Sequence, residues 1–259
     1  MTRALVTGAG KRLGREMALE LARQGCDVAV HYAQSGAAAE EVAAEIRRMG
    51  RQAVTLGADL LDEAQVLPLV GRAAEGLGGP VLVLVNNASI FEHDSLETAT
   101  RESWDRHMES NLRAPFVLMQ EMARAVPEPE TDAAGEPRAR GLVVNMIDQR
   151  VRKLTPGFAS YTVAKMGLWA LTRTAAQALA PRVRVNAIGP GPTLQGHRQS
   201  DSHFARQRAA TVLGRGADAD DITAALAYLL SARSVTGQLI CVDGGQHLGW
   251  QTPDVLGPE

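Results

Sequence analysis

Short runs of β-forming residues alternate with longer helical patterns along almost the whole of this 259-residue chain. Such an alternation predicts a parallel sheet in which the crossover connections are helices. Several strand candidates are almost unbroken apolar runs, which is typical of strands covered by helices on both faces. The predicted strands span residues 4–7, 27–32, 53–58, 81–86, 141–146, 183–188 and 238–242. The predicted helices span residues 13–24, 37–49, 63–76, 101–125, 157–180 and 218–231.

The order of these elements predicts an α/β fold, a Rossmann-type, doubly wound sheet of seven parallel strands with helices on both faces. A chain of this length can bury one large core, so we expect a single domain over residues 1–259. Two stretches interrupt the pattern. Residues 126–140 are rich in proline and acidic residues and predict a surface insertion, with or without a role of its own. Residues 189–209 combine a Pro-Gly-Pro sequence with a polar run, which favours a substrate flap.

Charge and cysteine content argue against several classes of function. A formal net charge of -2 gives no basic field that would attract nucleic acid or an anionic membrane. No apolar run reaches the roughly 18 residues that a membrane span requires. Cys26 and Cys241 lack the spacing of metal ligands or of a disulfide framework, so we expect reduced thiols and no metal site. We therefore expect a cytoplasmic protein that acts on a small molecule, without a nucleic-acid or membrane partner.

A glycine-rich turn, TGAGKRLG over residues 7–14, joins the first predicted strand to the first predicted helix. Glycine lets the backbone approach a pyrophosphate closely, while the N–H groups and dipole of the following helix attract the negative charge. The alternative is an ordinary strand-to-helix connection. From this turn we expect contacts to a dinucleotide from Gly8, Lys11, Arg12, Leu13 and Gly14.

The end of the second predicted strand decides between the two nicotinamide cofactors. An acidic residue there would bind the ribose 2′-hydroxyl and repel a 2′-phosphate. This chain has His31, Tyr32 and Ser35 in that region, while Lys11 and Arg12 stand in the neighbouring turn. A guanidinium fork and a hydroxyl suit a phosphate dianion, so we predict NADPH. The alternative is that the two cations only lie on a solvated face.

Tyr161 and Lys165 stand four residues apart in a predicted helix, so their side chains share one face. A nearby ammonium favours phenolate, and we therefore expect Lys165 to lower the pKa of the Tyr161 phenol. Asp148 stands thirteen residues before Tyr161. An ionised Asp148 would oppose phenolate formation, keep the phenol protonated for reduction, and accept hydrogen bonds from substrate N–H groups. The alternative is a decayed site in which Asp148 only caps a turn.

The glycine turn, residues 86–89 (NNAS), the Tyr-x-x-x-Lys pair and residues 185–191 (VNAIGPG) occur in the order found in short-chain dehydrogenases/reductases. The resemblance covers residues 4–245, but the family usually has glycine in place of Arg12 and Ser89, and serine in place of Asp148. It implies that Tyr161 gives or takes the proton, that Lys165 also holds the nicotinamide ribose, and that Asn111 supports a proton relay. As alternatives, Asn111 is a plain helix residue and Asp59 an N-cap. The resemblance further implies cofactor contacts from Asp59, Leu60, Asn87, Ala88, Ser89, Pro190, Gly191 and Thr193.

Within this family, the chain most resembles the pteridine reductases and the related dihydromonapterin reductases. The resemblance rests on Arg12, residues 31–35, Phe91 and the Asp148–Tyr161–Lys165 set. It implies that a pterin stacks on Phe91, and that Asp148 and Tyr161 deliver a proton to a ring nitrogen. The alternative for Phe91 is a packed core residue. We thus predict NADPH-dependent reduction of a pterin C=N bond, in dihydromonapterin or a similar dihydropterin, and the acceptance of dihydrofolate stays open.

Two other functions remain open at this point. One is an NADPH-dependent carbonyl reductase acting on a ketone or a 3-oxoacyl thioester, and the other is a catalytically silent NADP-binding scaffold. The helix over residues 161–180 carries only two charged residues, which predicts burial on more than one side. This apolar helix and the segment over residues 238–245 together predict the subunit contacts of a homotetramer. The alternative for the helix is burial inside one subunit. The tail at residues 250–253 is a candidate to close over a pocket.

Overall fold

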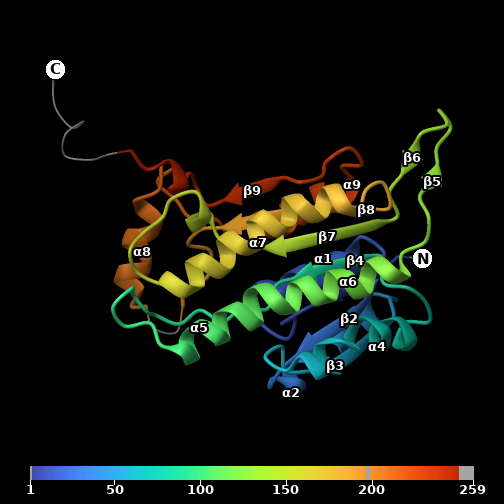
Figure 1. The fold of residues 1–259 in the computed structure, drawn as a ribbon, viewed down its shortest axis with the longest axis horizontal. Coiled ribbons are helices and arrows are strands. Elements are labelled where there is room, and N and C mark those ends of the chain that lie inside the picture. The colour runs from blue at the N-terminus through green and yellow to red at the C-terminus, as the bar shows by residue number, and fades with distance from the viewer. Residues whose placement is uncertain (1, 197–198, 251–259) are drawn as a thin grey trace.

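The computed structural model of the chain describes residues 2–196 and 199–250. Within them, seven parallel strands form one sheet in the order β3-β2-β1-β4-β7-β8-β9 (Figure 1). Each strand ends within two residues of its predicted bounds, so the doubly wound fold and its single sheet are confirmed. The strands are β1 (Arg3–Val6), β2 (Asp27–Tyr32), β3 (Ala53–Gly57), β4 (Val83–Asn86), β7 (Gly141–Met146), β8 (Val183–Pro190) and β9 (Leu239–Val242).

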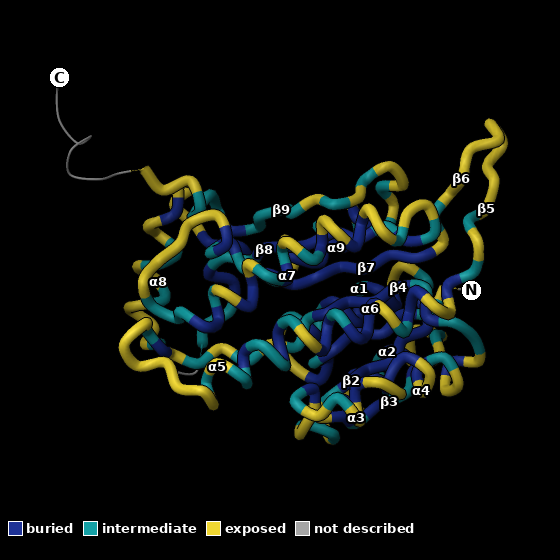
Figure 2. Tube along the Cα trace, in the orientation of Figure 1, coloured by how far each residue is buried: buried dark blue, intermediate teal, exposed yellow. Residues whose placement is uncertain are grey.

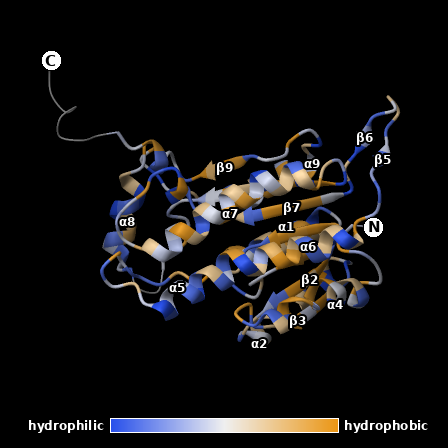
Figure 3. Cartoon of the chain, in the orientation of Figure 1, coloured by the Kyte–Doolittle hydropathy of each residue, from blue (hydrophilic) through white to orange (hydrophobic). Residues whose placement is uncertain are grey.

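Helices cover both faces of the sheet, as the apolar strands require. One apolar core lies between the sheet and α1, α2 and α9, and a second lies between the sheet and α4, α6 and α7. Figure 2 shows β7 and β8 as mainly buried and the edge strand β9 as intermediate, and Figure 3 shows β2 and β7 as mainly hydrophobic. The helices are α1 (Arg12–Arg23), α2 (Gly36–Arg48), α3 (Glu63–Val66), α4 (Leu69–Gly76), α5 (Arg101–Met108), α6 (Ala114–Ala125), α7 (Ala159–Ala178), α8 (Asp201–Ala209) and α9 (Ala219–Ser231).

Three predicted helices differ from the observed ones. The helix predicted over residues 63–76 is divided into α3 and α4 at Pro68, because proline lacks the N–H that a continuous helix needs. The helix predicted over 101–125 contains one π-helical turn, η1 (Glu109–Arg113), between α5 and α6. The helix predicted from residue 157 begins at Ala159, since Phe158 adopts a left-handed conformation (φ 61°).

The insertion at residues 126–140 contains an antiparallel hairpin of β5 (Glu130–Thr131) and β6 (Pro137–Arg138). Its turn is closed by Asp132, whose carboxylate accepts from the backbone N–H groups of Ala134 and Glu136. Figure 1 shows the hairpin at the end of the molecule away from the arrowhead of β7 and from α5 and α8. The insertion therefore projects from the opposite end of the sheet and does not shape a pocket at the carboxyl ends of the strands.

The segment predicted as a flap contains a helix, α8, which the proline-rich and polar pattern did not reveal. Residues 197–198 of this segment, and residues 251–253 of the predicted closing tail, lie outside the described residues. In the part of the chain that the structure describes, none of the helices is long and apolar enough to cross a membrane. The same residues contain no group of three or more His, Cys, Asp or Glu side chains arranged to hold a metal ion.

Candidate active site

The glycine turn after β1 brings two backbone segments too close together for a side chain. A Cβ atom at Gly14 would lie 2.2 Å from the Gly8 carbonyl oxygen, so only glycine fits. Gly8 itself has a positive φ of 63°, and Arg12 takes a similar left-handed conformation with φ 54°. Arg12 therefore occupies a backbone position that favours glycine, which accounts for the tight turn ahead of α1.

Backbone and amide hydrogen bonds tie this turn to the end of β4. The Thr7 hydroxyl accepts from the N–H groups of Asn87, at 2.9 Å, and Ala88, at 3.0 Å. The Asn87 side-chain amide donates to the carbonyl oxygens of Thr7, at 2.8 Å, and Gly8, at 3.2 Å. The predicted cofactor residues of the two loops thus form one continuous network at the carboxyl edge of the sheet.

His31 braces the turn from β2. The Gly8 N–H donates to His31 Nδ1 at 3.0 Å, so the proton resides on Nε2, which donates to the Ala58 carbonyl at 3.0 Å. Burial lowers the pKa of His31 to about 4. The buried, neutral imidazole therefore supports the loop that a cofactor would contact. The side chain of the neighbouring Tyr32 packs closely against Gly36 and Gly57. A Cβ atom added at Gly36 would lie 3.2 Å from it, and one added at Gly57 would lie 3.1 Å from it.

Arg12 and Ser35, which we paired as phosphate ligands, do not contact each other. The Arg12 guanidinium donates to the backbone carbonyls of Leu194, at 3.0 Å, and Gln195, at 2.8 Å. Arg12 thus connects the glycine turn to the flap. The Ser35 hydroxyl stands beside Gly10, where an added Cβ would lie 3.1 Å from it, and Lys11 is exposed at the start of α1. Their roles toward a phosphate stay predictions.

The other predicted cofactor residues line the same edge of the sheet. Asp59 does not cap α3, since that N-cap is Asp62; the Asp59 carboxylate instead accepts from the Leu61 N–H at 3.0 Å. Leu60 is buried in the core on the side of α4, α6 and α7, and Leu13 is partly buried against the other core, on the side of α1, α2 and α9. At the end of β8, Pro190 precedes Gly191, where a Cβ would collide with Asp243, and the Thr193 hydroxyl donates to the Gly191 carbonyl at 3.2 Å.

Tyr161, at the start of α7, and Asp148, just after β7, are directly hydrogen-bonded. The phenol donates to Asp148 Oδ2 at 3.0 Å, while the other carboxylate oxygen accepts from the Arg150 N–H at 2.8 Å. Asp148 therefore caps the short 3-10 helix η2 (Gln149–Val151) and holds the phenol at the same time. The turn-capping alternative for Asp148 is thus observed, together with a hydrogen bond to the phenol, and its role in catalysis stays a prediction.

The expected effect of Lys165 on Tyr161 is wrong. Burial, together with the Asp148 carboxylate, raises the pKa of the Tyr161 phenol well above its ordinary value, and the positive charge of Arg150 and a hydrogen bond with Ser89 only partly oppose this. The Lys165 ammonium donates to the Met146 carbonyl at 2.8 Å and lies 5.7 Å from the centroid of the Tyr161 ring. Burial lowers the pKa of Lys165 to about 8. The phenol is thus kept protonated, as we expected from an ionised Asp148.

Asp148 itself also holds its proton more readily than an exposed carboxyl group. Burial raises its pKa, while the Arg150 N–H and the nearby cations act in the opposite direction. Tyr161 and Lys165 are only 5% and 2% exposed. This end of the site therefore concentrates three ionisable side chains in a place from which water is largely excluded.

Asn111 lies in the π-helical turn η1 and is fully buried. Its side-chain oxygen accepts from the Ile90 N–H at 2.9 Å, and its amide donates to the Ile90 carbonyl at 2.8 Å. It thus fixes the loop that follows Ser89, and no hydrogen bond among the described residues joins it to Tyr161 or Lys165. π-Helical turns often occur at functional sites, but the relay role of Asn111 stays a prediction.

Phe91 is 47% exposed, which rules out the alternative of a packed core residue. Its ring stacks on Phe158 at 4.3 Å, with 6° between the planes, and meets the edge of Tyr161 at 4.7 Å. Phe158 was not predicted as a site residue, because it falls inside the helix predicted over residues 157–180. Its position three residues before Tyr161, directly after Gly157, was the available signal for a residue on this side of the site.

A second missed cluster anchors the start of α7. Ser160 donates through its hydroxyl to the buried carboxylate of Asp94, and His107 Nδ1 lies 2.7 Å from the same hydroxyl. The other nitrogen of His107 accepts from the Glu92 N–H at 3.1 Å, so Nδ1 carries the proton and donates. The cluster fixes Tyr161 through its chain neighbour. No spacing in the sequence joins residues 94, 107 and 160, so no signal could have found it.

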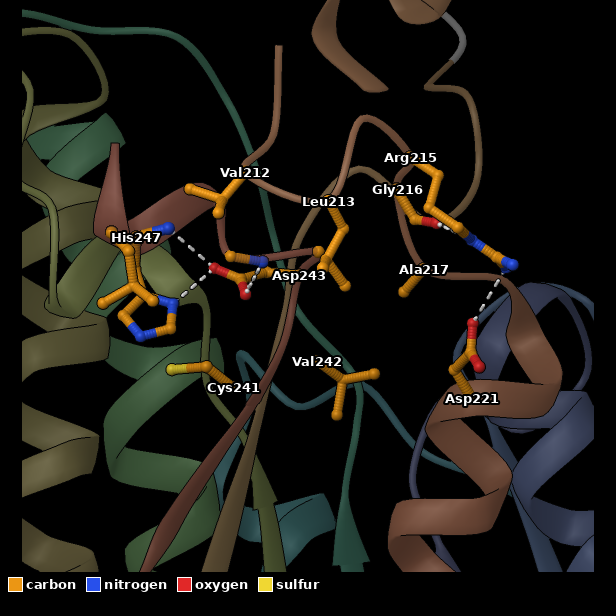
Figure 4. Close-up of a pocket in the computed structure, with 13 residues that line it drawn as sticks. Val212, Leu213, Arg215, Gly216, Ala217, Asp221, Cys241, Val242, Asp243 and His247 are labelled. Atoms are coloured by element: carbon orange, nitrogen blue, oxygen red, sulfur yellow. Dashed lines mark hydrogen bonds and ion pairs between the residues drawn. The ribbon is translucent and has the colours of Figure 1, made fainter. Parts of the chain in front are cut away.

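A cavity of about 580 Å³ lies beyond the end of β9, on the side of α9. Figure 4 shows it between Asp243, which binds His247, and Arg215, which lies near Asp221. Its described lining contains none of the predicted catalytic residues. Cys241 also lines the cavity, while Cys26 is buried elsewhere; both are free thiols, and burial raises both pKa values to about 11.

The fold and the site define a Rossmann-type oxidoreductase, with a phosphate turn and a buried Tyr–Lys pair at one edge of a parallel sheet. A family model described as enoyl-(acyl carrier protein) reductase matches residues 8–247. The chain is 33% identical over 250 residues to the 3-oxoacyl-(acyl-carrier-protein) reductase FabG of Staphylococcus aureus, covering 95% of this chain and 98% of the relative. The chain belongs to the short-chain dehydrogenase/reductase family.

Solved structures give the same assignment of the fold. The FolM alternative dihydrofolate reductase 1 of Brucella suis, in complex with NADP, is 44% identical and superimposes with a TM-score of 0.90 over 98% of each chain. The angucycline C-6 ketoreductase LanV with bound NADP is 31% identical, with a TM-score of 0.85 over 96% of each chain. The same fold thus serves proteins named for a dihydrofolate and for a ketone.

Proposed function

We propose that this protein, an NADP-dependent oxidoreductase of the short-chain family, reduces a C=N bond in a dihydropterin, with dihydrofolate among its substrates. The proposal depends on one observation above the others, the hydrogen bond from the Tyr161 phenol to Asp148. Short-chain enzymes that act on ketones usually have a serine hydroxyl in place of this carboxylate. The 44% identity to the FolM dihydrofolate reductase of Brucella suis supports the same substrate class.

A carboxylate at position 148 suits a substrate with N–H groups. It can accept from a pterin ring N–H, whereas a ketone presents only an acceptor oxygen and needs a donor there. The phenol remains protonated because burial and Asp148 raise its pKa. A protonated phenol beside the substrate can give its proton to the nitrogen of the C=N bond. Tyr161 is thus the proposed proton donor, and Asp148 orients the substrate and the phenol.

The glycine turn fits a dinucleotide. The cradle formed by Gly8 and Gly14 leaves no room for side chains, and the N-terminus of α1 opens directly beyond it. NADPH, when bound, supplies the hydride that this reduction requires. The residues that would hold it are those of the turn, with Lys11, Arg12 and Ser35 for the phosphate, and Asn87, Ala88, Ser89 and Thr193 for the remainder of the molecule.

Lys165, Asn111 and Phe91 have supporting parts in this proposal. Lys165 is fixed by the Met146 carbonyl beside the Tyr161 ring, where its ammonium can bind a ribose hydroxyl. Asn111 holds the loop that carries Ser89 and Phe91. The exposed ring of Phe91 provides a surface on which a planar pterin can stack.

The carbonyl reductase is the second candidate, and the 33% identity to FabG and the 31% identity to LanV favour it. A panel of dihydrofolate, dihydromonapterin, dihydrobiopterin, simple ketones and a 3-oxoacyl thioester separates the two, with NADPH oxidation as the readout. We expect turnover of the dihydropterins and little of the carbonyl compounds. Turnover of carbonyl compounds alone would disprove the pterin proposal, and NADPH binding without any turnover would indicate the silent scaffold.

Asp148→Ser sharpens this test because it restores the residue usual in the family. Loss of the carboxylate should lower kcat/KM for dihydropterins by about 10²-fold, the size of a positioned proton-transfer interaction. Any activity on a ketone should be retained or should rise. Equal loss for both substrate types would contradict the assignment of Asp148 to the pterin.

We also propose that four copies assemble into a homotetramer and that the flap closes over the substrate. Exposed apolar side chains on α5 and α7, namely Trp104, Val163 and Met166, support burial against another copy. The contact from Arg12 to Leu194 and Gln195 supports a flap that responds to the cofactor. The cytoplasmic location stays a prediction from the sequence.

A further inference from the structure

Arg150 stands between the proton-transfer pair and the aromatic residues that border it. It belongs to η2, directly after β7, and its backbone N–H donates to Asp148. Its guanidinium lies 5.1 Å from the centroid of the Phe158 ring and donates to the Thr155 hydroxyl. The side chain thus turns from the backbone beside Asp148 toward the outer side of the aromatic cluster.

The hydrogen-bonding capacity of Arg150 is not used up by the protein. Its Nε atom is buried and has no hydrogen-bond acceptor among the described residues. Arg150 also forms no ion pair with a carboxylate within the part of the chain that the structure describes. The connection from β7 to α7, residues 149–158, contains Arg152 and Lys153 as well but no acidic residue. Arg150 is half-buried, its buried Nε atom lacks an acceptor and, among the described residues, its other guanidinium N–H groups are paired only with the Thr155 hydroxyl, so the side chain can still donate to an anionic group from outside the protein.

A row of aromatic rings leads from the proton donor to this cation. Tyr161 meets Phe91 at 4.7 Å, Phe91 stacks on Phe158 at 4.3 Å, and Phe158 faces the Arg150 guanidinium at 5.1 Å. A substrate whose reacting ring lies at Tyr161 can therefore extend an aromatic tail along these rings. The end of such a tail would reach Arg150.

We propose that Arg150 is a specificity-determining residue that binds a carboxylate on the tail of the substrate. This inference rests on the proposed function, because it places the reacting pterin ring at Tyr161. Dihydrofolate has the required chemistry, an aminobenzoyl ring followed by glutamate carboxylates. Dihydromonapterin has a short, uncharged polyhydroxy side chain. Arg150 therefore favours the acidic, aryl-substituted dihydropterin over the neutral one.

A different role for Arg150 would act on the chemistry itself. Its positive charge lies close enough to stabilise the ionised forms of Asp148 and Tyr161. In that case its removal would weaken the reduction of every substrate by a similar factor and would shift the pH profile of kcat. Carboxylate binding predicts instead a change confined mainly to KM and to the acidic substrate.

The experiment compares Arg150→Gln, Arg150→Lys and Arg152→Gln in steady-state kinetics with dihydrofolate and dihydromonapterin. Arg152 is the matched control, since it belongs to the same connection but its guanidinium lies 5.8 Å from the centroid of the Trp169 ring on α7. For Arg150→Gln, we expect the ratio of kcat/KM for dihydrofolate to that for dihydromonapterin to fall about 10- to 100-fold, as loss of a charge-assisted hydrogen bond predicts. The loss should lie mainly in KM, and Arg150→Lys should restore part of it.

Three results would overturn the inference. They are an unchanged ratio in Arg150→Gln, an equal fall of the ratio in Arg152→Gln, and a wild-type enzyme that reduces dihydromonapterin but not dihydrofolate. Each of these leaves the proposed reduction of a dihydropterin intact, although the third removes dihydrofolate from the proposed substrates. Failure of the wild-type enzyme to reduce either dihydropterin would instead disprove the proposed function. Thermal unfolding of the Arg150 variants, measured alongside, separates a loss of binding from a loss of fold.

Discussion

The glycine turn after β1 and the Tyr161–Asp148 pair beside β7 stand at the same edge of the sheet but are held by different interactions. In the turn, Thr7, Asn87 and the neutral His31 bind backbone groups, and these contacts are all between uncharged partners. At the pair, Tyr161, Asp148 and Lys165 bring ionisable groups into a buried space.

This difference separates geometry from electrostatics. The turn depends on the shape of the backbone, so it should be sensitive to a single added carbon atom and insensitive to pH near neutrality. The function of the Tyr161–Asp148 pair depends on which group carries the proton. Turnover should therefore be sensitive to loss of the Tyr161 hydroxyl, even though that loss hardly changes the packing. A change in the glycine turn should therefore leave proton transfer at the Tyr161–Asp148 pair largely intact, and a change at the pair should leave the backbone of the turn largely intact.

The largest effect is expected at the pair, from Tyr161→Phe. This change removes the phenolic proton but keeps the ring, so turnover of the accepted substrate should fall about 10²- to 10⁴-fold, the usual contribution of a positioned acid. The dissociation constant for NADPH, measured by fluorescence titration, should change less than about threefold, which is roughly 0.7 kcal/mol, because the phenylalanine ring keeps the packing of the tyrosine ring. Turnover at the wild-type rate would remove Tyr161 from the mechanism.

At the turn, Gly14→Ala should have the opposite pattern. The added Cβ would lie 2.2 Å from the Gly8 carbonyl, so the turn must shift, at a cost of about 1–3 kcal/mol in the free energy of unfolding. NADPH binding should weaken with it, as measured by the same titration.

Gly71→Ala provides the matched control for this change. Gly71 lies in α4, where an added Cβ would have no atom within 4 Å, so alanine there should be neutral or stabilise the protein by about 0.4–1 kcal/mol. Similar chemical denaturation curves for the two alanine variants would show that the turn is not sterically restricted.

A further expected effect, which appears only below neutral pH, is a dependence of stability on pH through His31. Its pKa is lowered from 6.5 to about 4 in the fold, so below pH 6.5 the unfolded chain binds a proton that the folded protein does not. Stability from this group is therefore complete above pH 6.5 and is lost as the pH falls toward 4. The loss at pH 5 should be roughly 2 kcal/mol.

Urea denaturation at pH 7.5 and pH 5 measures this dependence. His31→Gln, which cannot titrate, should lose less stability between the two pH values than the wild-type protein does. An identical loss in both proteins would show that His31 is not the responsible group.

Much of the fold followed from the sequence because alternation of apolar strands and amphipathic helices is a local pattern. The strand bounds, the glycine turn and the Tyr161–Lys165 spacing are all set by residues close together in the chain. The π-helical turn at Asn111 and the left-handed Phe158 were missed, since each is imposed by packing against a distant loop. The hairpin in the insertion was missed because its two short strands show no alternation.

The sequence by itself determined which groups are available at the edge of the sheet, because residue order fixes the ends of the strands and the face of a helix. It also indicated that an aspartate occupies the place of a serine. Only the tertiary structure decided how these groups ionise. Burial and the Asp148 contact raise the pKa of Tyr161 despite the nearby Lys165, and a pKa depends on the solvent and charges that surround the folded group in three dimensions.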